Sequence, residues 1–314
     1  MVVGIDVGGQ TSKIGVVDAR GNVLAQTVIR TDIYSDVAPY IAELAEAVKK
    51  VIKDAGAEGK VRGIGVGAPN GNYYTGTIEN APNLVWGRQR VEFAKLLSEA
   101  LGGLPVALTN DANAAAVGEM TYGAARGMKN FIMITLGTGV GSGIVINGEV
   151  VYGHDGFAGE LGHVAAVRNN GRTCNCGKTG CLETYASATG VARTAREWLE
   201  LTDEPSVLRS LDNIASKDVY EAAKDGDKLA LKIFEFTGKI LGRSFADFIA
   251  FSSPEAIVLF GGLARAKEFL NGPIEEAMNA NVLPLWRGKV KIVYSQLKES
   301  DAAILGASAL AWEL

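Results

Sequence analysis

The sequence predicts an α/β protein of two related lobes, each opened by a β-β-β-α unit, with a ligand cleft between the lobes. The main observation is that a buried strand runs into a glycine-rich turn twice, in GIDVGG and in ITLGTGVGSG. Laying Ile5 on Ile134 places Gly8 on Gly137 and matches IGVVDARGNV with GIVINGEV. Glycine-rich hairpins are common, so coincidence is the alternative. Both copies open a mixed α/β region, however, which favours a duplication, and a cleft between lobes is the usual place for a ligand.

The first copy is expected to begin with three strands and a helix. Short apolar runs predict the strands, and residues 18–22 supply the turn between the second and the third. Apolar residues at helical spacing follow from Val37 to Ile52. The expected elements are strands at 2–7, 13–17, 23–30, 63–67 and 106–109, and helices at 36–55 and 112–119.

The second copy repeats this order from residue 131. Its sequence predicts a strand, a glycine turn, a strand, the Asn147-Gly148 hairpin turn and a third strand. Residues 186–250 are expected to be mainly helical with a polar break at 201–207, and a strand at 256–260 precedes another helix. A terminal amphipathic helix closes the fold. The lobes are therefore expected at 1–112 plus about 298–314, and at 113–297.

Composition and charge exclude several classes of protein. The net charge of −4 and the pI near 5.4 argue against a general binder of nucleic acid or of membrane surfaces. The apolar runs are shorter than the roughly 18 residues of a membrane span, and the N-terminus lacks the pattern of a signal peptide. An odd number of cysteines disfavours a disulfide framework and indicates the reducing cytoplasm.

The glycine-rich turns are candidate sites for ATP and Mg²⁺. Backbone N–H groups in such a turn can surround phosphate oxygens, and a Cβ would block that approach. Each turn alone favours an ordinary tight hairpin, but two turns at matching places favour phosphate binding. Asp6 adds a carboxylate that suits a Mg²⁺-bound water. The candidates are Asp6, Gly8, Gly9, Gln10, Thr11, Ser12 and Lys13, then Gly137, Thr138, Gly139 and Gly141, and Gly261 and Gly262. The last two follow a later strand and suit a third close approach, to a nucleoside.

Carboxylates supply the candidates for catalysis. Asp111 stands where a strand meets a helix, so it is either the N-cap of that helix or a general base for a substrate hydroxyl. Glu160 and His163 lie in GELGH, and Glu183 follows the cysteines. A hydroxyl-rich substrate needs such a set of acceptors. Glu183 is equally suited to be the first-turn acid of a helix.

All three cysteines lie in the stretch GRTCNCGKTGCLE. Gly177 and Gly180 let this loop, within 163–183, fold back on itself. Together with His163, the three cysteines offer the four ligands of a tetrahedral zinc site. Four protein ligands leave no open position, so a bound zinc ion is expected to be structural and to fix Glu160 relative to Glu183. Three unrelated buried cysteines are the alternative. The candidate Cys3His ligands are His163, Cys174, Cys176 and Cys181.

Taken together, these motifs resemble those of the ROK family (repressors, open reading frames and kinases), within the actin-like, hexokinase-like (ribonuclease H-like) ATPases. The family pattern comprises a DxGGT-type motif, an Asn-Asp pair, LGTGxG, GExGH and CxCGxxGCxE. This chain carries them in the same order, at 6–10, 110–111, 136–141, 159–163 and 174–183. Gln10 departs from the pattern, in which threonine is usual, and Thr11 and Ser12 offer neighbouring hydroxyls.

The resemblance implies a role for each motif. Asp111 is implied to be the catalytic base on the 6-hydroxyl of a sugar, and His163 to serve both zinc and sugar. Asp6 is implied to position Mg²⁺, and Thr138 with its glycine neighbours to meet the ATP phosphates. A homodimer is the implied assembly. The residues implied to bind the sugar are Asn110, Asp111, Glu160, His163 and Glu183, with Gly71, Asn72 and Asn83 on a sugar-side wall.

The first hypothesis is therefore an ATP-dependent hexokinase or glucokinase that phosphorylates the 6-hydroxyl of a hexose, with glucose as first choice. A kinase for N-acetylmannosamine, N-acetylglucosamine, fructose or allose is the alternative, because pocket volume is not readable from sequence. A sugar-responsive repressor needs a DNA-reading module, and the strand expected from residue 2 leaves no room ahead of it. We expect ATP and a sugar as partners, and neither nucleic acid nor membrane.

Overall fold

The computed structural model describes residues 1–314, except for the side chain of Glu299. The chain forms two compact units, and helix 111–122 and the segment 143–159 group with the first of them. The units therefore divide the chain at other points than the predicted lobes, whose boundaries stay a prediction. The first unit comprises Met1–Met128, Gly143–Gly159 and Ser295–Leu314, and the second comprises Lys129–Ser142 and Glu160–Tyr294.

A mixed sheet of order β3-β2-β1-β4-β7 forms the centre of the first unit. β1 pairs antiparallel with β2 and parallel with β4. β4 is buried along its whole length, whereas every second residue of the edge strand β3 is exposed. The strands are β1 (Val2–Val7), β2 (Thr11–Val17), β3 (Val23–Arg30), β4 (Ile64–Ala68) and β7 (Val106–Asn110), with a short hairpin of β5 (Gly71–Asn72) and β6 (Thr77–Ile78) after β4.

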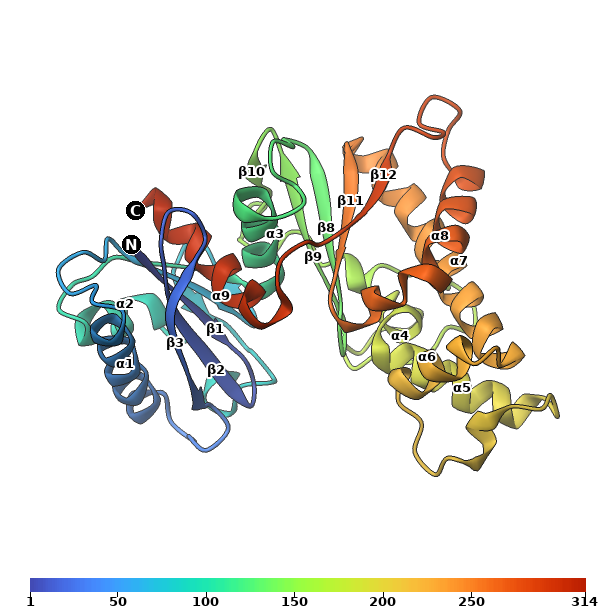
Figure 1. The fold of residues 1–314 in the computed structure, drawn as a ribbon, viewed down its shortest axis with the longest axis horizontal. Coiled ribbons are helices and arrows are strands. Elements are labelled where there is room, and N and C mark those ends of the chain that lie inside the picture. Colours follow the sequence, from blue (N-terminus) through green and yellow to red (C-terminus); the bar gives the residue numbers. More distant parts are fainter. The chain divides into compact units, whose positions relative to one another are not determined.

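Helices cover both faces of this sheet (Figure 1). Val3 and Ile5 of β1 point into the core formed with α1, while Gly4 between them faces α9. A Cβ at Gly4 or at Gly65 of β4 would collide with the backbone of α9, so these glycines let the helix lie directly on the strands. The helices are α1 (Val37–Asp54), α2 (Phe93–Ala100), α3 (Asp111–Tyr122) and α9 (Glu299–Leu310).

The second sheet repeats the first, with the order β10-β9-β8-β11-β12. Its outer hairpin is antiparallel, and β11 pairs parallel with both β8 and β12. Ile5 and Ile134 occupy the same position along β1 and β8, so the predicted duplication is confirmed at the level of topology. The strands are β8 (Phe131–Leu136), β9 (Val140–Ile146), β10 (Glu149–Val150), β11 (Ala256–Phe260) and β12 (Lys291–Tyr294).

Along the chain, the helices of the second unit lie between β10 and β12, in the region where the sequence predicted them. α7 is its longest helix within the described residues, and it packs closely on α8 where Gly238 and Gly242 face that helix. No helix of the described chain is both long and apolar enough to cross a membrane. α2, β12 and the hairpin β5–β6 were not predicted. The helices are α4 (Glu183–Ala186), α5 (Ala188–Leu201), α6 (Ser216–Lys224), α7 (Lys228–Ser252) and α8 (Lys267–Asn281).

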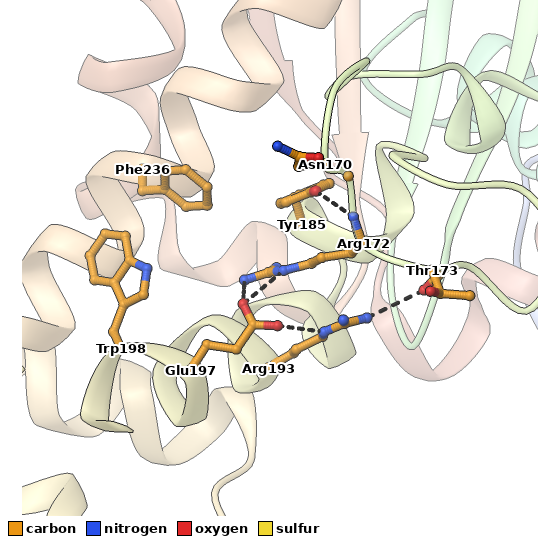
Figure 2. A pocket seen from close by; sticks show the side chains of 9 residues that line it. Asn170, Arg172, Thr173, Tyr185, Arg193, Glu197, Trp198 and Phe236 are labelled. Atoms are coloured by element: carbon orange, nitrogen blue, oxygen red, sulfur yellow. Dashed lines mark hydrogen bonds and ion pairs between the residues drawn. The ribbon is translucent and has the colours of Figure 1, made fainter. Parts of the chain in front are cut away.

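A pocket of about 420 Å³ opens in the second unit, beside the loop that carries the cysteines (Figure 2). Two arginines and a glutamate form its polar side, and aromatic rings form the other. Its lining residues are Asn170, Gly171, Arg172, Thr173, Tyr185, Arg193, Glu197, Trp198 and Phe236.

Candidate active site and metal centre

Asp111 lies at the junction of β7 and α3, where the predicted base was expected. The N-cap of α3 is Asn110, whose Oδ1 accepts a hydrogen bond of 2.8 Å from the backbone N–H of Ala112. The alternative interpretation of Asp111 as the N-cap is therefore wrong by one residue. Asp111 Oδ1 also accepts from Ala112 N–H at 2.8 Å, but the side chain is exposed, so its carboxylate can meet a ligand.

Burial raises the pKa of several carboxylates in the first unit, among them Asp6 and Asp111 of the predicted site. Surrounding protein desolvates Asp111 and raises its pKa, although water still reaches the side chain. Desolvation, joined by the negative charge of Asp111, raises the pKa of Asp6 to about 6, against the opposing charge of Lys13. A carboxylate whose ionisation a second carboxylate disfavours is suited to accept a proton or to share a cation with it.

The first glycine turn, between β1 and β2, is tight. Gly8 N–H donates to Thr11 O over 3.0 Å. A Cβ at Gly9 would come within 2.8 Å of Asn83 O, so Asn83, predicted on the sugar-side wall, lies beside this turn. The side chain of Gln10 is exposed, and the backbone carbonyl of Gln10 accepts from the backbone N–H of Thr31, the residue after β3.

Ser12, predicted to contact a phosphate, lies in the core. It is fully buried, and its hydroxyl makes hydrogen bonds of 2.7 Å with Thr31 Oγ1 and with Tyr40 Oη. A hydroxyl engaged twice in the core gives no support to the predicted contact with a phosphate. Thr11, one position earlier on β2, is exposed, so its contact with a phosphate stays a prediction.

The second glycine turn, between β8 and β9, contacts Glu183. Gly137 N–H donates to Gly139 O over 3.0 Å, and Val140 N–H donates to Glu183 Oε2 over 3.0 Å. A Cβ at Gly139 would collide with that carboxylate, so glycine is required there. Glu183 is also the first residue of α4, which confirms its interpretation as a first-turn acid. Thr138 is exposed at the tip of the turn, and Gly141 N–H donates to Thr135 Oγ1 over 3.1 Å.

Two further candidates have structural tasks. Asn72 is buried; its Nδ2 donates to Asp155 O over 2.7 Å and its Oδ1 accepts from Tyr74 N–H over 3.1 Å. A Cβ at Gly71 would collide with the backbone of β7. Both residues therefore shape their loop, and these contacts give no support to the prediction that they bind a sugar.

The Gly261-Gly262 pair follows β11, where a third close approach was predicted. Gly261 has a φ of 103°, and its Cβ would meet Leu136 O at 2.6 Å. The close approach at Gly261 is therefore to the backbone of β8, and the structure gives no support to the predicted approach of a nucleoside there. Gly262 faces open space.

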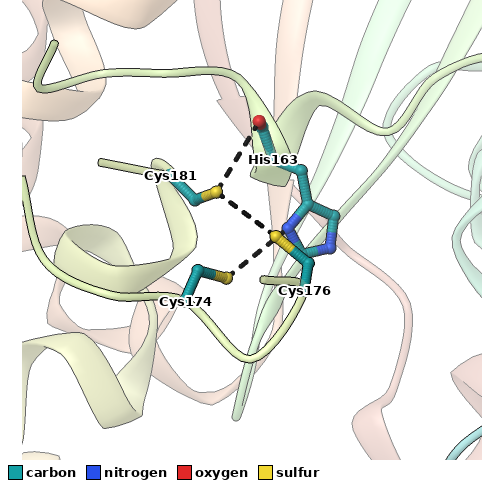
Figure 3. A group of neighbouring side chains, drawn as sticks. All are labelled: His163, Cys174, Cys176 and Cys181. Atoms are coloured by element: carbon teal, nitrogen blue, oxygen red, sulfur yellow. Dashed lines mark hydrogen bonds between the residues drawn. The ribbon is translucent and has the colours of Figure 1, made fainter. Parts of the chain in front are cut away.

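The four predicted zinc ligands come together in the second unit (Figure 3). Their ligand atoms all lie within 4.8 Å of one another. Gly177 and Gly180 have φ values of 86° and 78°, the left-handed conformation that the predicted turn back of the loop requires. The residues of this cluster, which we call the Cys3His cluster, are His163, Cys174, Cys176 and Cys181.

The geometry of the Cys3His cluster fits zinc. Tetrahedral zinc places two sulfur ligands roughly 3.8 Å apart, and sulfur and nitrogen about 3.6 Å apart. Cys176 Sγ lies 3.6 Å from Cys181 Sγ, and Cys174 Sγ lies 3.7 Å from His163 Nδ1. Burial and the neighbouring thiols raise the pKa of Cys181 to about 12, so a metal ion would have to displace its proton.

The GELGH segment is anchored beside the second glycine turn. Leu161 N–H donates to Ser142 Oγ over 3.0 Å, and Gly162 approaches Val140 O too closely for any Cβ. Lys178 Nζ donates to His163 O over 2.7 Å and ties the segment to the cysteine loop. Glu160 is exposed, which leaves its carboxylate accessible to solvent.

Comparisons with known proteins agree over the whole length. A family model described as the ROK family matches residues 2–313. A glucokinase of Halalkalibacterium halodurans is 38% identical over 97% of this chain and 92% of that protein. A solved ROK family glucokinase from Streptomyces griseus, in complex with glucose and AMPPNP, is 32% identical, covers 100% of this chain and 99% of that one, and has a TM-score of 0.80. A xylose repressor of Caldicellulosiruptor bescii is 28% identical over 98% of this chain and 77% of the repressor.

Proposed function

Because the chain belongs to the ROK family, we propose that it is an ATP-dependent glucokinase, which transfers the γ-phosphoryl group of ATP to the 6-hydroxyl of glucose. Its fold is the actin-like, hexokinase-like α/β fold of that family. The observation that carries the proposal is the similarity to glucokinases over nearly the full length of the chain.

Asp111 is the proposed general base. Its exposed carboxylate accepts the proton of the 6-hydroxyl while that oxygen forms a bond to the γ-phosphorus and the bond from phosphorus to the β-phosphate oxygen breaks, which leaves ADP. The raised pKa of Asp111 supports this role, since a more basic carboxylate takes a proton more readily. Asn110 fixes the start of α3 and so holds the base in place.

Asp6 and the two glycine turns are proposed to hold Mg-ATP. Mg²⁺ would neutralise charge on the phosphates when it is bound, and Asp6 is an acceptor for one of its water ligands. Backbone N–H groups near Gly9 and Thr138 are the proposed phosphate donors. A nearby cation would also offset the cost of ionising the buried Asp6, which supports the assignment.

Glu160 and Glu183 are the proposed acceptors for the other sugar hydroxyls, and His163 is a proposed donor to one of them. Zinc, bound to the Cys3His cluster, would supply structural cross-linking of the loop and no chemistry of its own, since four protein ligands fill its tetrahedron. His163 contributes Nδ1 to the cluster, which leaves Nε2 for a sugar hydroxyl. The cluster thereby fixes two sugar acceptors, Glu160 and Glu183, one near each end of the loop.

A homodimer in the cytoplasm, without nucleic acid, is the proposed assembly. Phe251 is 91% exposed, and Leu283 and Leu285 of the same unit are 56% and 53% exposed, which supports association of two copies through this unit. The free thiols of the cysteines suit a reducing compartment, and the net charge of −4 disfavours nucleic acid. Light scattering after gel filtration measures the oligomer directly.

The proposal is tested by ADP release from Mg-ATP with each candidate sugar, ranked by kcat/KM. Glucose is expected to lead N-acetylmannosamine, N-acetylglucosamine, fructose and allose. A lead for an N-acetylated sugar would keep Asp111 as base but overturn the choice of glucose. No turnover with any sugar would overturn the kinase assignment.

A further inference from the structure

The pocket of Figure 2 is built around a buried arginine whose hydrogen bonds all go to the protein. The side chain of Arg172 is 8% exposed. Its planar group has five N–H donors, and the structure gives each of them an acceptor. A pocket whose central cation is already satisfied has little affinity left for a ligand, so this arginine serves the protein itself.

The acceptors of Arg172 lie on α4 and α5. Nη1 donates to Thr184 O over 2.8 Å and to Gly190 O over 3.4 Å. Nη2 donates to Thr194 Oγ1 over 2.9 Å and also to Glu197 Oε2, and Nε donates to Glu197 Oε2 over 3.0 Å. The guanidinium carbon also lies 4.5 Å from the centre of the Tyr185 ring, which adds a cation–π contact.

The backbone of Arg172 forms hydrogen bonds that tie the loop of the Cys3His cluster to α4. Its N–H donates to Tyr185 Oη over 2.8 Å, and its carbonyl accepts from Gly180 N–H over 2.8 Å. Gly180 directly precedes Cys181, and Cys174 lies two positions after Arg172. Arg172 therefore joins both arms of the metal-binding loop, the one next to Cys174 and the one next to Cys181, to the helix that starts at Glu183.

α4 depends on such an external partner. It has four residues, Glu183–Ala186, and a single helical turn has little stability of its own because its carbonyls lack partners within the helix. Arg172 supplies a partner to Thr184 O and brings a positive charge to the end of the helix where the dipole is negative. The first residue of the same turn is Glu183, which accepts from Val140 N–H at the second glycine turn.

We propose that Arg172 is a positioning residue for sugar binding: it locks α4 to the Cys3His loop and so fixes the carboxylate of Glu183. The part played by Glu183 in sugar binding rests on the proposed function, whereas the lock itself does not. Lysine cannot replace Arg172, because a single ammonium lacks the planar fork that reaches carbonyl, hydroxyl and carboxylate together.

Arg193 offers a matched control. It pairs with the same Glu197, through Nε at 2.7 Å, and its Nη1 donates to Thr173 O over 3.3 Å. Its side chain is 38% exposed, and its hydrogen bonds go to Glu197 and Thr173 rather than to Thr184 or Tyr185. Removing Arg193 therefore removes one guanidinium from the same network but leaves α4 locked.

The test compares Arg172→Met and Arg172→Lys with Arg193→Met, using glucose and ATP KM values, zinc content and hydrogen exchange of residues 183–190. Both Arg172 variants are expected to raise the glucose KM by roughly tenfold or more with the ATP KM changed less than about threefold. They are also expected to speed exchange in α4, whereas Arg193→Met changes neither. If Arg172→Met does not fold, Tyr185→Phe removes only the hydroxyl that accepts from Arg172 N–H and is expected to speed the same exchange.

Unchanged exchange in residues 183–190 for a folded Arg172 variant or for Tyr185→Phe would overturn the lock. A lower melting temperature with an unchanged glucose KM would also overturn the positioning role and leave a purely structural one. Failure of the wild type to phosphorylate glucose would refute the proposed function instead, and the exchange measurement would still decide on Arg172.

Discussion

The two sheets of the molecule share one strand order, yet the carboxylates near their glycine turns come from different parts of the chain. At the first turn the carboxylates come from the sheet's own strand ends, with Asp6 on β1 and Asp111 next to β7. At the second turn the carboxylate comes from Glu183, more than one element away, and reaches Val140 N–H only because the Cys3His loop and α4 hold it there. Shared topology thus fixes where a turn lies, whereas the groups around it depend on local inserts.

The comparison also shows why the two turns suit different tasks. Carboxylates on strand ends are held by the sheet itself, which favours the precise placement that proton transfer requires. A carboxylate on an inserted loop is free to differ between relatives with the same sheet, which favours substrate recognition. We therefore expect changes at the first copy to affect turnover, and changes at the insert to affect sugar affinity.

The largest effect is expected for Asp111→Asn. The amide keeps the shape and the hydrogen bond to Ala112 N–H but cannot accept the substrate proton, so kcat should fall by about 10²–10⁴-fold. Glucose affinity and zinc content should stay close to those of the wild type. Steady-state kinetics with calorimetric binding of glucose measures the split, and a kcat within tenfold of the wild type would remove Asp111 as base.

A smaller effect, on the glucose KM rather than on kcat, is expected for Glu183→Gln. The amide oxygen can still accept from Val140 N–H and keep the turn, but the negative charge toward the sugar is lost. We expect the glucose KM to rise by about 10–100-fold, the range of a lost charge-assisted hydrogen bond. The exposed Glu200→Gln on α5 is the control. An unchanged glucose KM would break the division between turnover and recognition.

The smallest effect is expected in the stability of Asp6→Asn. The folded-state pKa of Asp6 is about 6 against an ordinary 3.8, so folding favours its protonated form. Its contribution to stability is present below 3.8 and is lost as the pH rises through about 6. The neutral variant should therefore be more stable than the wild type at pH 7.5, by about 1–2 kcal/mol after solvent screening, and less so at pH 5.

Urea unfolding without Mg²⁺ or nucleotide measures this difference. The same variant should lose Mg-ATP turnover, so stability and activity change in opposite directions. A gain in stability that does not depend on pH would mean that the substitution acts by packing rather than by removing a charge.

Much of the fold could be predicted because its signals are local. β1, β3 and α1 carry clear periods bounded by glycine turns, and the expected bounds differ from the observed ones by at most a residue. β12 is the four-residue segment KIVY, which shows no clear alternation, and its hydrogen bonds come from β11, which is distant in the sequence. α2 spans eight residues, too short for a periodic pattern to stand out.

The site was predictable where its chemistry is local and missed where it depends on tertiary contacts. The Cys3His cluster could be predicted because its ligands lie on one loop. Ser12 was assigned to a phosphate, although it shares a strand face with Ile14 and Val16 of the core, and this period of two was the signal for burial. Arg172 had no sequence signal, since its acceptors lie up to 25 residues away in the chain.

The affinity for glucose before and after removal of zinc tests the central claim most directly, namely that the inserted loop supplies sugar recognition to an otherwise repeated scaffold. Calorimetry without nucleotide should show binding weakened by roughly tenfold or more in the metal-free protein, with full recovery when zinc is restored. A metal-free protein that stays folded and binds glucose with unchanged affinity would contradict the account.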